Sequence, residues 1–293
     1  VRLAFYLPMV DQTYQEVAAD FPYGAETGAV AAAIAQGRGF SSPLRFVQTG
    51  PTAWFAPIFP YLLAGIFKLF GVYSYTSSLI IHFLNLSFSA FTCWPIAAIA
   101  TRAFGRKTGI AAAWAWVLLP TAIFYSVAWV WDTSLAALWL SLLIAATLRL
   151  RGSNRMNWWL GYGALWSAGA MINPSLISVL PPLALWAIWP LRKRLAPALK
   201  LASAAALIFA VGIAPWTIRN YLVFDKFIPL RSNFGLELWL GNNPEVPDSW
   251  TWWLHPDDHL EEAHKYAQMT EIPYMEEKEH EAWAFIRSHP ADA

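Results

Sequence analysis

Long apolar runs alternate with short polar turns through the middle of the chain. Runs of spanning length, about 17–25 residues, occur at 75–101, 110–131, 133–149, 157–172, 174–190 and 199–217. Of the 19 acidic residues, four lie in 1–26 and fourteen lie from Asp225 onward, so Asp132 is the only one in the apolar middle. The pattern predicts an all-α fold, a polytopic transmembrane helical bundle.

The turns between these runs are of two kinds, and the kinds alternate. The basic turns are "RAFGRK" (102–107), "RLRGSNR" (149–155) and "RKRLAPALK" (192–200), whereas "WDTS" (131–134) and "NPS" (173–175) carry no basic residue. Lys and Arg mark cytoplasmic loops. The three basic turns are therefore predicted to face the cytoplasm, and the turns at Asp132 and Asn173 are predicted to face the other side.

The segment "PTAWFAPIFPYLLAGIFKLFG" (51–71) is apolar but contains three prolines and Lys68. It is too short to cross the bilayer as a helix, so we predict an interfacial or re-entrant segment. The first span then ends near Val10, and residues 11–74 form one large outer loop on the same side as Asp132. Within that loop, 29–35 is predicted to be a short helix that ends at "GRG", with Glu26 in its first turn.

Composition supports a membrane protein and narrows the chemistry. Of the 293 residues, 57% are hydrophobic and 13% are charged, about half the charged fraction of a soluble domain. One cysteine, Cys93, excludes an internal disulfide framework. No phosphate-binding loop, dinucleotide fingerprint, metalloprotease motif or nucleic-acid patch is present, so no nucleic-acid partner is expected.

Two isolated carboxylates are the candidate catalytic groups. Asp132 either caps the helix that begins at 133 or serves chemistry at the membrane surface, and these roles are compatible. Glu26 either complements the dipole of its helix or presents a carboxylate to the outer interface. Three further residues lie beyond the last span as candidate substrate-binding groups. They are Arg219 and Asn220, where the last helix meets the outer interface, and Arg231 just beyond it. The two guanidinium groups either bind phosphate or extend toward lipid headgroups.

The C-terminal segment predicts soluble amphipathic helices with ordinary charged faces. Its five histidines lack tight ligand spacing and are interpreted as solvated, whereas His82, inside a span, is expected to be packed or hydrogen-bonded. The predicted organisation is a transmembrane module at 1–221 and a soluble helical segment at 222–293. Because the chain begins at Val1 and ends at "SHPADA" without a terminal signal, we interpret it as a truncated piece of a longer protein.

The order of these features resembles the multispanning glycosyltransferases of the C superfamily (GT-C), in the branch of protein O-mannosyltransferases and of aminoarabinose transferases that modify lipid A. The matching stretches are "ETGAVAAAIAQGRGFSSP", "TGPTAWFAPIFPYLLAGIFKLFG", the acid of "WDTSLAAL" and "APWTIRNYLVFDKFIPLRSNFGLELWLGNNP". The resemblance implies juxtamembrane helices in the first outer loop. It also implies an enzyme of the bacterial inner membrane with its active site on the periplasmic side.

The resemblance further implies the partners and the residue roles. The donor would be a polyprenyl-phosphate sugar and the acceptor a protein or a glycolipid, including lipid A or a cell-envelope glycan. Glu26 would be the base for the acceptor hydroxyl, although the family's usual Asp-Glu pair is replaced by Ala25–Glu26, and Asp11 and Asp20 are alternatives. Arg219 and Arg231 would steady the phosphate, and Asp132 would orient an acceptor, a ligand or a metal. Some relatives use a divalent cation, and the spacing leaves the metal and any other cofactor unknown.

Two other classes of membrane protein fit part of this sequence pattern. A transporter or flippase would also carry isolated charges within the membrane, but it places polar groups in broken helices near the midplane, and here the acids cluster at one surface. A non-catalytic membrane scaffold would use the acidic C-terminal segment to bind partners and would not need Glu26, Asp132 or Arg219.

Overall fold

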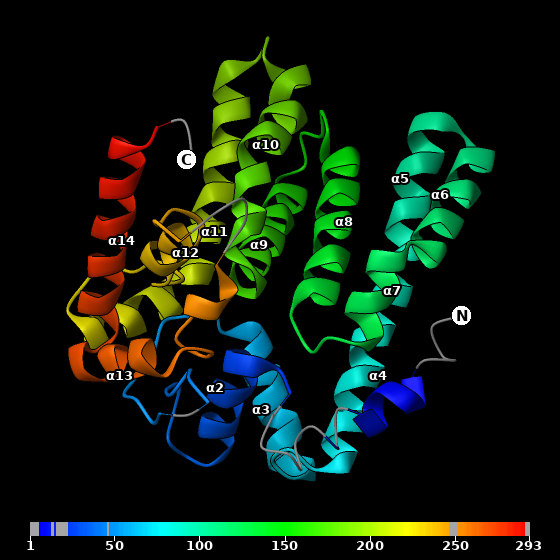
Figure 1. Cartoon of the computed structure of the whole chain (residues 1–293). Helices are drawn as coiled ribbons and strands as arrows, with labels where there is room; N and C mark the ends of the chain where they lie inside the picture. Colours follow the sequence, from blue (N-terminus) through cyan, green and yellow to red (C-terminus); the bar gives the residue numbers. More distant parts are fainter. Residues whose placement is uncertain (1–5, 13–14, 16–22, 46, 246–250, 291–293) are drawn as a thin grey trace. The chain divides into compact units, whose positions relative to one another are not determined.

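The computed structural model describes residues 6–12, 15, 23–45, 47–245 and 251–290, and most of these residues lie in helices (Figure 1). Within them, no strand forms apart from one isolated bridge between Ser41 and Pro51. The predicted all-α class is confirmed. The helices in the first half are α2 (Ala25–Ala35), α3 (Ile58–Phe70), α4 (Tyr75–Phe91), α5 (Cys93–Phe104), α6 (Arg106–Leu118), α7 (Pro120–Val127) and α8 (Thr133–Leu150).

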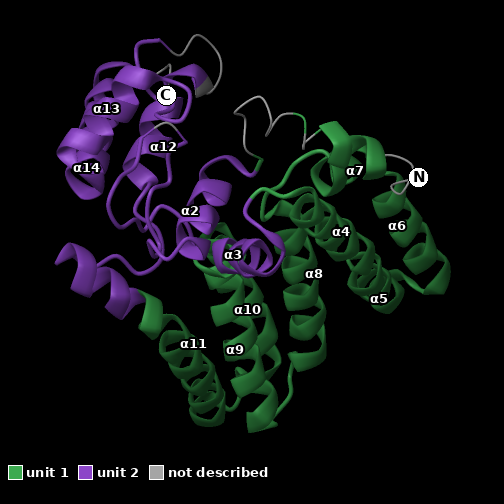
Figure 2. Cartoon of the chain, turned by 90° about the horizontal axis from the view of Figure 1, so that it is seen from below, with its two compact units in different colours: residues 1–23, 57–59, 73–216 green, residues 24–56, 60–72, 217–293 purple. Residues whose placement is uncertain are grey.

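The second half continues with α-helices and short 3₁₀ turns. These are α9 (Met156–Ile172), η1 (Pro174–Val179), α10 (Leu180–Ile188), η2 (Trp189–Leu191), α11 (Leu195–Phe224), α12 (Phe234–Gly241), η3 (Trp252–Leu254), α13 (Leu260–Met269) and α14 (Glu271–Ser288). The chain divides into two compact units (Figure 2). Unit 1 comprises 1–23, 57–59 and 73–216, and unit 2 comprises 24–56, 60–72 and 217–293.

Four stretches are long and apolar enough to cross a membrane. They are Tyr75–Phe104, which joins α4 and α5, Thr133–Leu150, Pro174–Leu191 and Leu195–Phe224. The pair α6 and α7 is bent by 53° and adds a fifth crossing if it counts as one span. The chain is therefore a multi-pass membrane protein, as the apolar runs predicted.

The predicted span 110–131 is not one helix. Helix α6 ends at Leu118, α7 begins at Pro120, and Leu119 between them is extended, with φ −63° and ψ 115°. Proline lacks the N–H that would continue the helical ladder, and it disfavours the helical conformation of the residue before it. Pro120 therefore produces the break that the continuous apolar run did not show.

Two other predicted spans differ in length from the observed helices. The run 157–172 forms α9, whose 17 residues make it shorter than the four spanning stretches. The run 199–217 is longer than predicted, because α11 continues through Pro215 to Phe224. Arg219 and Asn220 therefore lie in the last turns of α11.

Within unit 1, the two kinds of turn lie at opposite ends of the helices. The backbone N–H of Gly152, in one basic turn, donates to the carbonyl of Ala187 at 3.2 Å, near the start of another basic turn. At the other end, the Asn173 side chain donates to Asp132 Oδ2 at 3.1 Å. Figure 1 shows the three basic turns at one end of these helices. The predicted grouping of the turns is thus confirmed within unit 1.

Helix α3 is short, as predicted for the proline-containing segment 51–71. Its 13 residues span about 20 Å, against a hydrocarbon core of about 30 Å. Its buried side chains include Leu63 and Phe67, and its exposed face carries Tyr61 and Leu69. Helix α2 also forms as predicted, with Glu26 in its first turn.

A buried carboxylate joins three separate segments of unit 2. Glu271, at the start of α14, accepts hydrogen bonds from the hydroxyl of Thr52, the backbone N–H of Ala53 at 2.7 Å, Ser232 Oγ at 2.6 Å and the Tyr266 hydroxyl at 2.8 Å. The segment around Thr52 and the C-terminal helices therefore fold together.

A buried lysine of α14 links this helix to α12 and α13. The ammonium group of Lys278 lies 3.5 Å from the centre of the Trp239 ring and pairs with Glu262 and Glu281. Helices α13 and α14 confirm the helical prediction for this region. Its charged faces are only partly solvated, however, because Glu271 and Lys278 are both buried.

Candidate active site

Glu26 is the central residue of the candidate site, and the backbone conformation of the two preceding residues sets its position. Gly24 and Ala25 both have positive φ, 83° and 42°, and turn the chain into α2. The left-handed region costs alanine roughly 1–2 kcal/mol, and residues held there cluster at functional sites. Asp and Asn tolerate this region better than Ala. The backbone at position 25 therefore suits the acid that the family usually places before Glu26.

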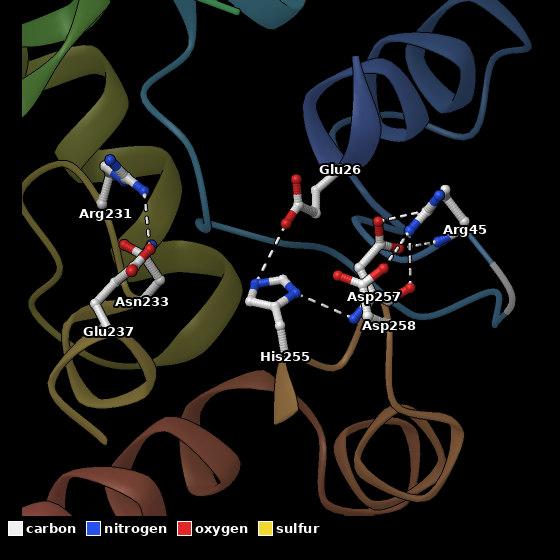
Figure 3. A network of polar contacts seen from close by, with 8 residues as sticks. All are labelled: Glu26, Arg45, Arg231, Asn233, Glu237, His255, Asp257 and Asp258. Atoms are coloured by element: carbon white, nitrogen blue, oxygen red, sulfur yellow. Dashed lines mark hydrogen bonds and ion pairs between the residues drawn. The ribbon is translucent and has the colours of Figure 1, made fainter. Parts of the chain in front are cut away.

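The Glu26 carboxylate faces His255 (Figure 3). Its Oε1 lies 3.2 Å from His255 Nε2, and 12% of the Glu26 side chain remains accessible. The other ring nitrogen of His255, Nδ1, accepts from the backbone N–H of Asp257 at 3.1 Å. A ring nitrogen that accepts a hydrogen bond carries no proton, so the neutral ring presents Nε2–H to Glu26.

Arg45 fixes the segment that holds His255. Its Nε donates to Asp257 Oδ2 at 2.6 Å, and its backbone N–H donates to Asp257 Oδ1 at 2.9 Å. Its terminal nitrogen also bonds Asp258 at 2.9 Å. The Trp54 ring packs edge-on against His255, with centroids 5.6 Å apart. The imidazole is thus held by its backbone, by its neighbours and by a charged pair behind it (Figure 3).

Burial dominates the titration of this cluster. It raises the pKa of Glu26 from 4.5 to about 7, with a further rise from the charge of Glu237 and an opposing effect from Arg45. Burial also raises the pKa of Asp257 to about 6. It lowers the pKa of His255, which favours the neutral ring. The cluster therefore contains a carboxyl group that exchanges its proton near neutral pH.

His255, Arg45 and Asp257 are functional candidates that sequence reasoning missed. His255 was predicted to be solvated, and that prediction is wrong, because its ring is buried between Trp54 and Glu26. A signal was present in "LHPDDHL", where titratable residues follow an aromatic run. Nothing in the sequence linked this stretch to Arg45, which lies 212 residues away from Asp257.

Arg219 and Asn220 connect α11 to loops of unit 2. Arg219 donates to the backbone carbonyls of Thr52 at 2.6 Å and Phe40 at 3.0 Å. Asn220 is fully buried, accepts from Arg219 at 3.0 Å and donates to the carbonyl of Ile228 at 3.0 Å. Both side chains therefore hold the loops in place, and their predicted role in substrate binding stays a prediction.

Arg231 lies in the same unit and also bonds a backbone carbonyl. Its Nε donates to the carbonyl of Trp54 at 2.9 Å, and its Nη2 lies 4.0 Å from Glu237 Oε1 (Figure 3). Glu237 also accepts from Asn233 at 2.8 Å. The predicted phosphate contact of Arg231 stays a prediction.

Asp132 belongs to unit 1, whereas Glu26 and His255 belong to unit 2. It occupies the N-cap position of α8, but its side chain makes no capping hydrogen bond. The carboxylate instead accepts from the side chain of Asn173. The cap interpretation therefore holds for the backbone position and is wrong for the side chain.

The remaining predicted groups lie elsewhere. Asp11, an alternative base, is exposed and accepts from the Tyr75 hydroxyl at 2.8 Å, and Asp20 falls outside the described residues. His82 bonds Ser78, as expected. His259 caps α13, and the other three histidines of the C-terminal segment are exposed. In the described part of the chain, no group of three or more His, Cys, Asp or Glu side chains is arranged to hold a metal ion.

The fold defines a class, a multi-pass membrane protein of apolar helices with a short apolar helix, α3, before the first spanning stretch at Tyr75–Phe104. The chain belongs to the dolichyl-phosphate-mannose-protein mannosyltransferase family, whose model matches residues 54–218, more than half of the chain. It is therefore a membrane glycosyltransferase, as the resemblance predicted. No curated protein and no solved structure matches the chain. The matched range includes Asp132 and Asn173, whereas Glu26 and His255 lie outside it.

Proposed function

We propose that the protein transfers a sugar from a polyprenyl-phosphate-linked donor to an acceptor at the extracytoplasmic face of the bacterial inner membrane, with Glu26 as general base. The observation that carries the proposal is the pairing of Glu26 with a fixed, neutral His255. A base works best when its pKa lies near the working pH, and burial brings Glu26 to about 7.

In the proposed reaction, the acceptor hydroxyl gives its proton to Glu26 while its oxygen forms a bond to the anomeric carbon. The bond from that carbon to the phosphate oxygen breaks, and polyprenyl phosphate leaves with the electron pair. A phosphate is already a good leaving group, so the main need at that end is positive charge. Arg219 and Arg231 are the proposed cations, and direct attack with inversion is the family's expected course.

The donor and acceptor are tested in cells and with purified protein. Mass spectrometry of glycans and lipids from cells with and without the gene identifies the modified acceptor as protein, lipid A or cell-envelope glycan. Purified protein in liposomes, supplied with a polyprenyl-phosphate sugar, is expected to release polyprenyl phosphate only when that acceptor is present. Movement of the donor across the bilayer without sugar transfer would contradict the proposal.

The pH dependence of the reaction tests the pairing of Glu26 with His255. The base is active as a carboxylate, so kcat/KM is expected to rise with pH up to a plateau, with the midpoint near 7. The Nε2–H of His255 favours the charged carboxylate, so His255→Phe should move the midpoint to higher pH. His264→Phe, at an exposed position of α13, serves as the matched control. An unchanged midpoint in His255→Phe would remove the histidine from the site.

The role of Asp132 is tested by Asp132→Asn. Asparagine keeps an oxygen that accepts from Asn173, so the unfolding free energy should change by less than about 1 kcal/mol. Activity should fall, though less completely than in Glu26→Gln, because the charge is lost and the geometry is kept. The measurements are initial rates and thermal unfolding in detergent. A variant that loses stability but keeps its activity would leave Asp132 a purely structural residue.

A further inference from the structure

A large apolar cavity lies within unit 1. Its volume is about 660 Å³, which is in the range of small-molecule sites, and it is formed by α9, α10 and α11. The buried rings of Trp159, Tyr162 and Trp166 form one wall. Alanines of α11, including Ala198 and Ala205, form another. Such a lining accepts a hydrocarbon chain and offers little to a polar ligand.

The packing around the cavity is tight, which keeps its shape. Successive rings of the aromatic wall meet edge to face, with centroids 6.3 Å and 6.1 Å apart. A Cβ added at Gly163 would lie 2.2 Å from the carbonyl oxygen of Ala205, so α9 and α11 approach as closely as their backbones permit. The Tyr162 hydroxyl is 2.8 Å from Thr147 Oγ1 of α8.

The cavity occupies the halves of the helices that adjoin the basic turns. It uses residues 159–166 of α9, just after the turn 149–155, and residues 195–209 of α11, within and just after the turn 192–200. The pair Asp132–Asn173 lies at the other end of α8 and α9. The cavity and the Asp132–Asn173 pair therefore lie toward opposite ends of the helices of unit 1.

One arginine without an acidic partner among the described residues lines the cavity, and a second such arginine lies in the basic turn 149–155. Arg192 lines the cavity, with its guanidinium 4.9 Å from the centre of the Trp189 ring and one N–H donated to the Trp189 carbonyl at 3.1 Å. Arg151 stacks on Trp186 at 4.8 Å. Among the residues that the structure describes, no acidic side chain pairs with Arg151 or Arg192. Guanidinium groups of this kind suit a phosphate.

We propose that this cavity binds an anionic phospholipid, with an acyl chain against the aromatic wall and the phosphate at Arg192. Basic pockets between transmembrane helices on the cytoplasmic side are typical sites for anionic headgroups. The site is separate from the proposed sugar transfer, because it lies in unit 1 at the basic ends of the helices and uses neither Glu26 nor Asp132.

The test measures lipid affinity directly. Native mass spectrometry of the purified chain, titrated with phosphatidylglycerol or phosphatidylcholine, gives the two dissociation constants. The wild type is expected to prefer phosphatidylglycerol. Arg192→Gln should weaken phosphatidylglycerol binding about fivefold and leave phosphatidylcholine unchanged. Arg102→Gln, which removes the same charge from another basic turn, should match the wild type.

A second pair of variants tests the cavity itself. Ala202→Phe places a ring in the cavity and should weaken binding of both lipids, whereas Ala210→Phe, on the same helix but not in the lining, should not. Gel filtration checks folding, and if Ala202→Phe fails to fold, the arginine pair decides. Equal binding by Arg192→Gln and Arg102→Gln would overturn the proposal. So would displacement of phosphatidylglycerol by an equal concentration of polyprenyl phosphate.

Discussion

Glu26→Gln is expected to lower the rate of sugar transfer by about 10²–10⁴-fold, the usual contribution of a general base. Glutamine has the same shape, and its carbonyl oxygen still faces the Nε2–H of His255, so the site should stay assembled. Only the ability to take a proton is lost. Initial rates at saturating donor and acceptor, with thermal unfolding of the same samples, measure both consequences.

The pH dependence of the unfolding free energy gives a second test of this variant. Burial raises the pKa of Glu26 from 4.5 to about 7, so the native state holds the proton more tightly than the unfolded state. The wild type should therefore lose stability as the pH rises between these two values. Glu26→Gln should lack this component, and Glu261→Gln, at an exposed position of α13, should keep it. Wild-type activity in Glu26→Gln would exclude Glu26 as the base and direct attention to Asp11.

Glu271→Ala is expected to destabilise the protein by about 3–5 kcal/mol, a cost typical of breaking a buried polar network. The substitution leaves the hydroxyls of Thr52, Ser232 and Tyr266 and one backbone N–H without their acceptor. Each unsatisfied buried donor costs about 1–3 kcal/mol, reduced where the loops relax. Thermal or denaturant unfolding in detergent measures the loss.

Two further variants separate this effect from a simple change of charge. Glu261→Ala removes an exposed carboxylate from the neighbouring helix and should change stability by less than about 0.5 kcal/mol. Glu271→Gln keeps one accepting oxygen and should lie between the alanine variant and the wild type. A stability of Glu271→Ala within 1 kcal/mol of the wild type would show that the four donors find other partners.

The apolar runs predicted the membrane helices because hydrocarbon demands continuous apolar surface and internally satisfied backbone. The same logic failed where a proline interrupted an apolar run. At Pro120, composition stays apolar while the helix breaks, so the hydrophobic pattern alone gave one span where two helices form. At Pro215 the reverse holds, since α11 passes through the proline.

The sequence predicted those residues of the candidate site that stand out in a short stretch of the chain, but not the contacts between distant stretches. Glu26 stood out because it lies in the first turn of a short helix in a predicted outer loop, and Asp132 because no other acid lies near it in the sequence. His255 could not be placed in the same way, since its role depends on contact with a residue more than 200 positions earlier. Helical periodicity reaches a few turns along the chain, and it carries no information about that pairing. The charge pattern likewise predicted that the side chains of Glu271 and Lys278 are exposed to solvent, whereas both are buried in the structure.

The contacting residues of unit 2 are far apart in the sequence, and this affects when the contacts can form during synthesis. Ala53 and Glu271 are 218 residues apart, and Arg45 and Asp257 are 212 apart. At about 5–20 residues per second, a ribosome needs roughly 10–45 s to make the intervening chain. During that interval the segments around Arg45 and Ala53 have been made but lack the carboxylates that hold them, while the apolar helices between are being delivered to the bilayer. A growing chain therefore carries Glu26 long before it has His255, and the candidate site is completed only after the intervening helices have been made.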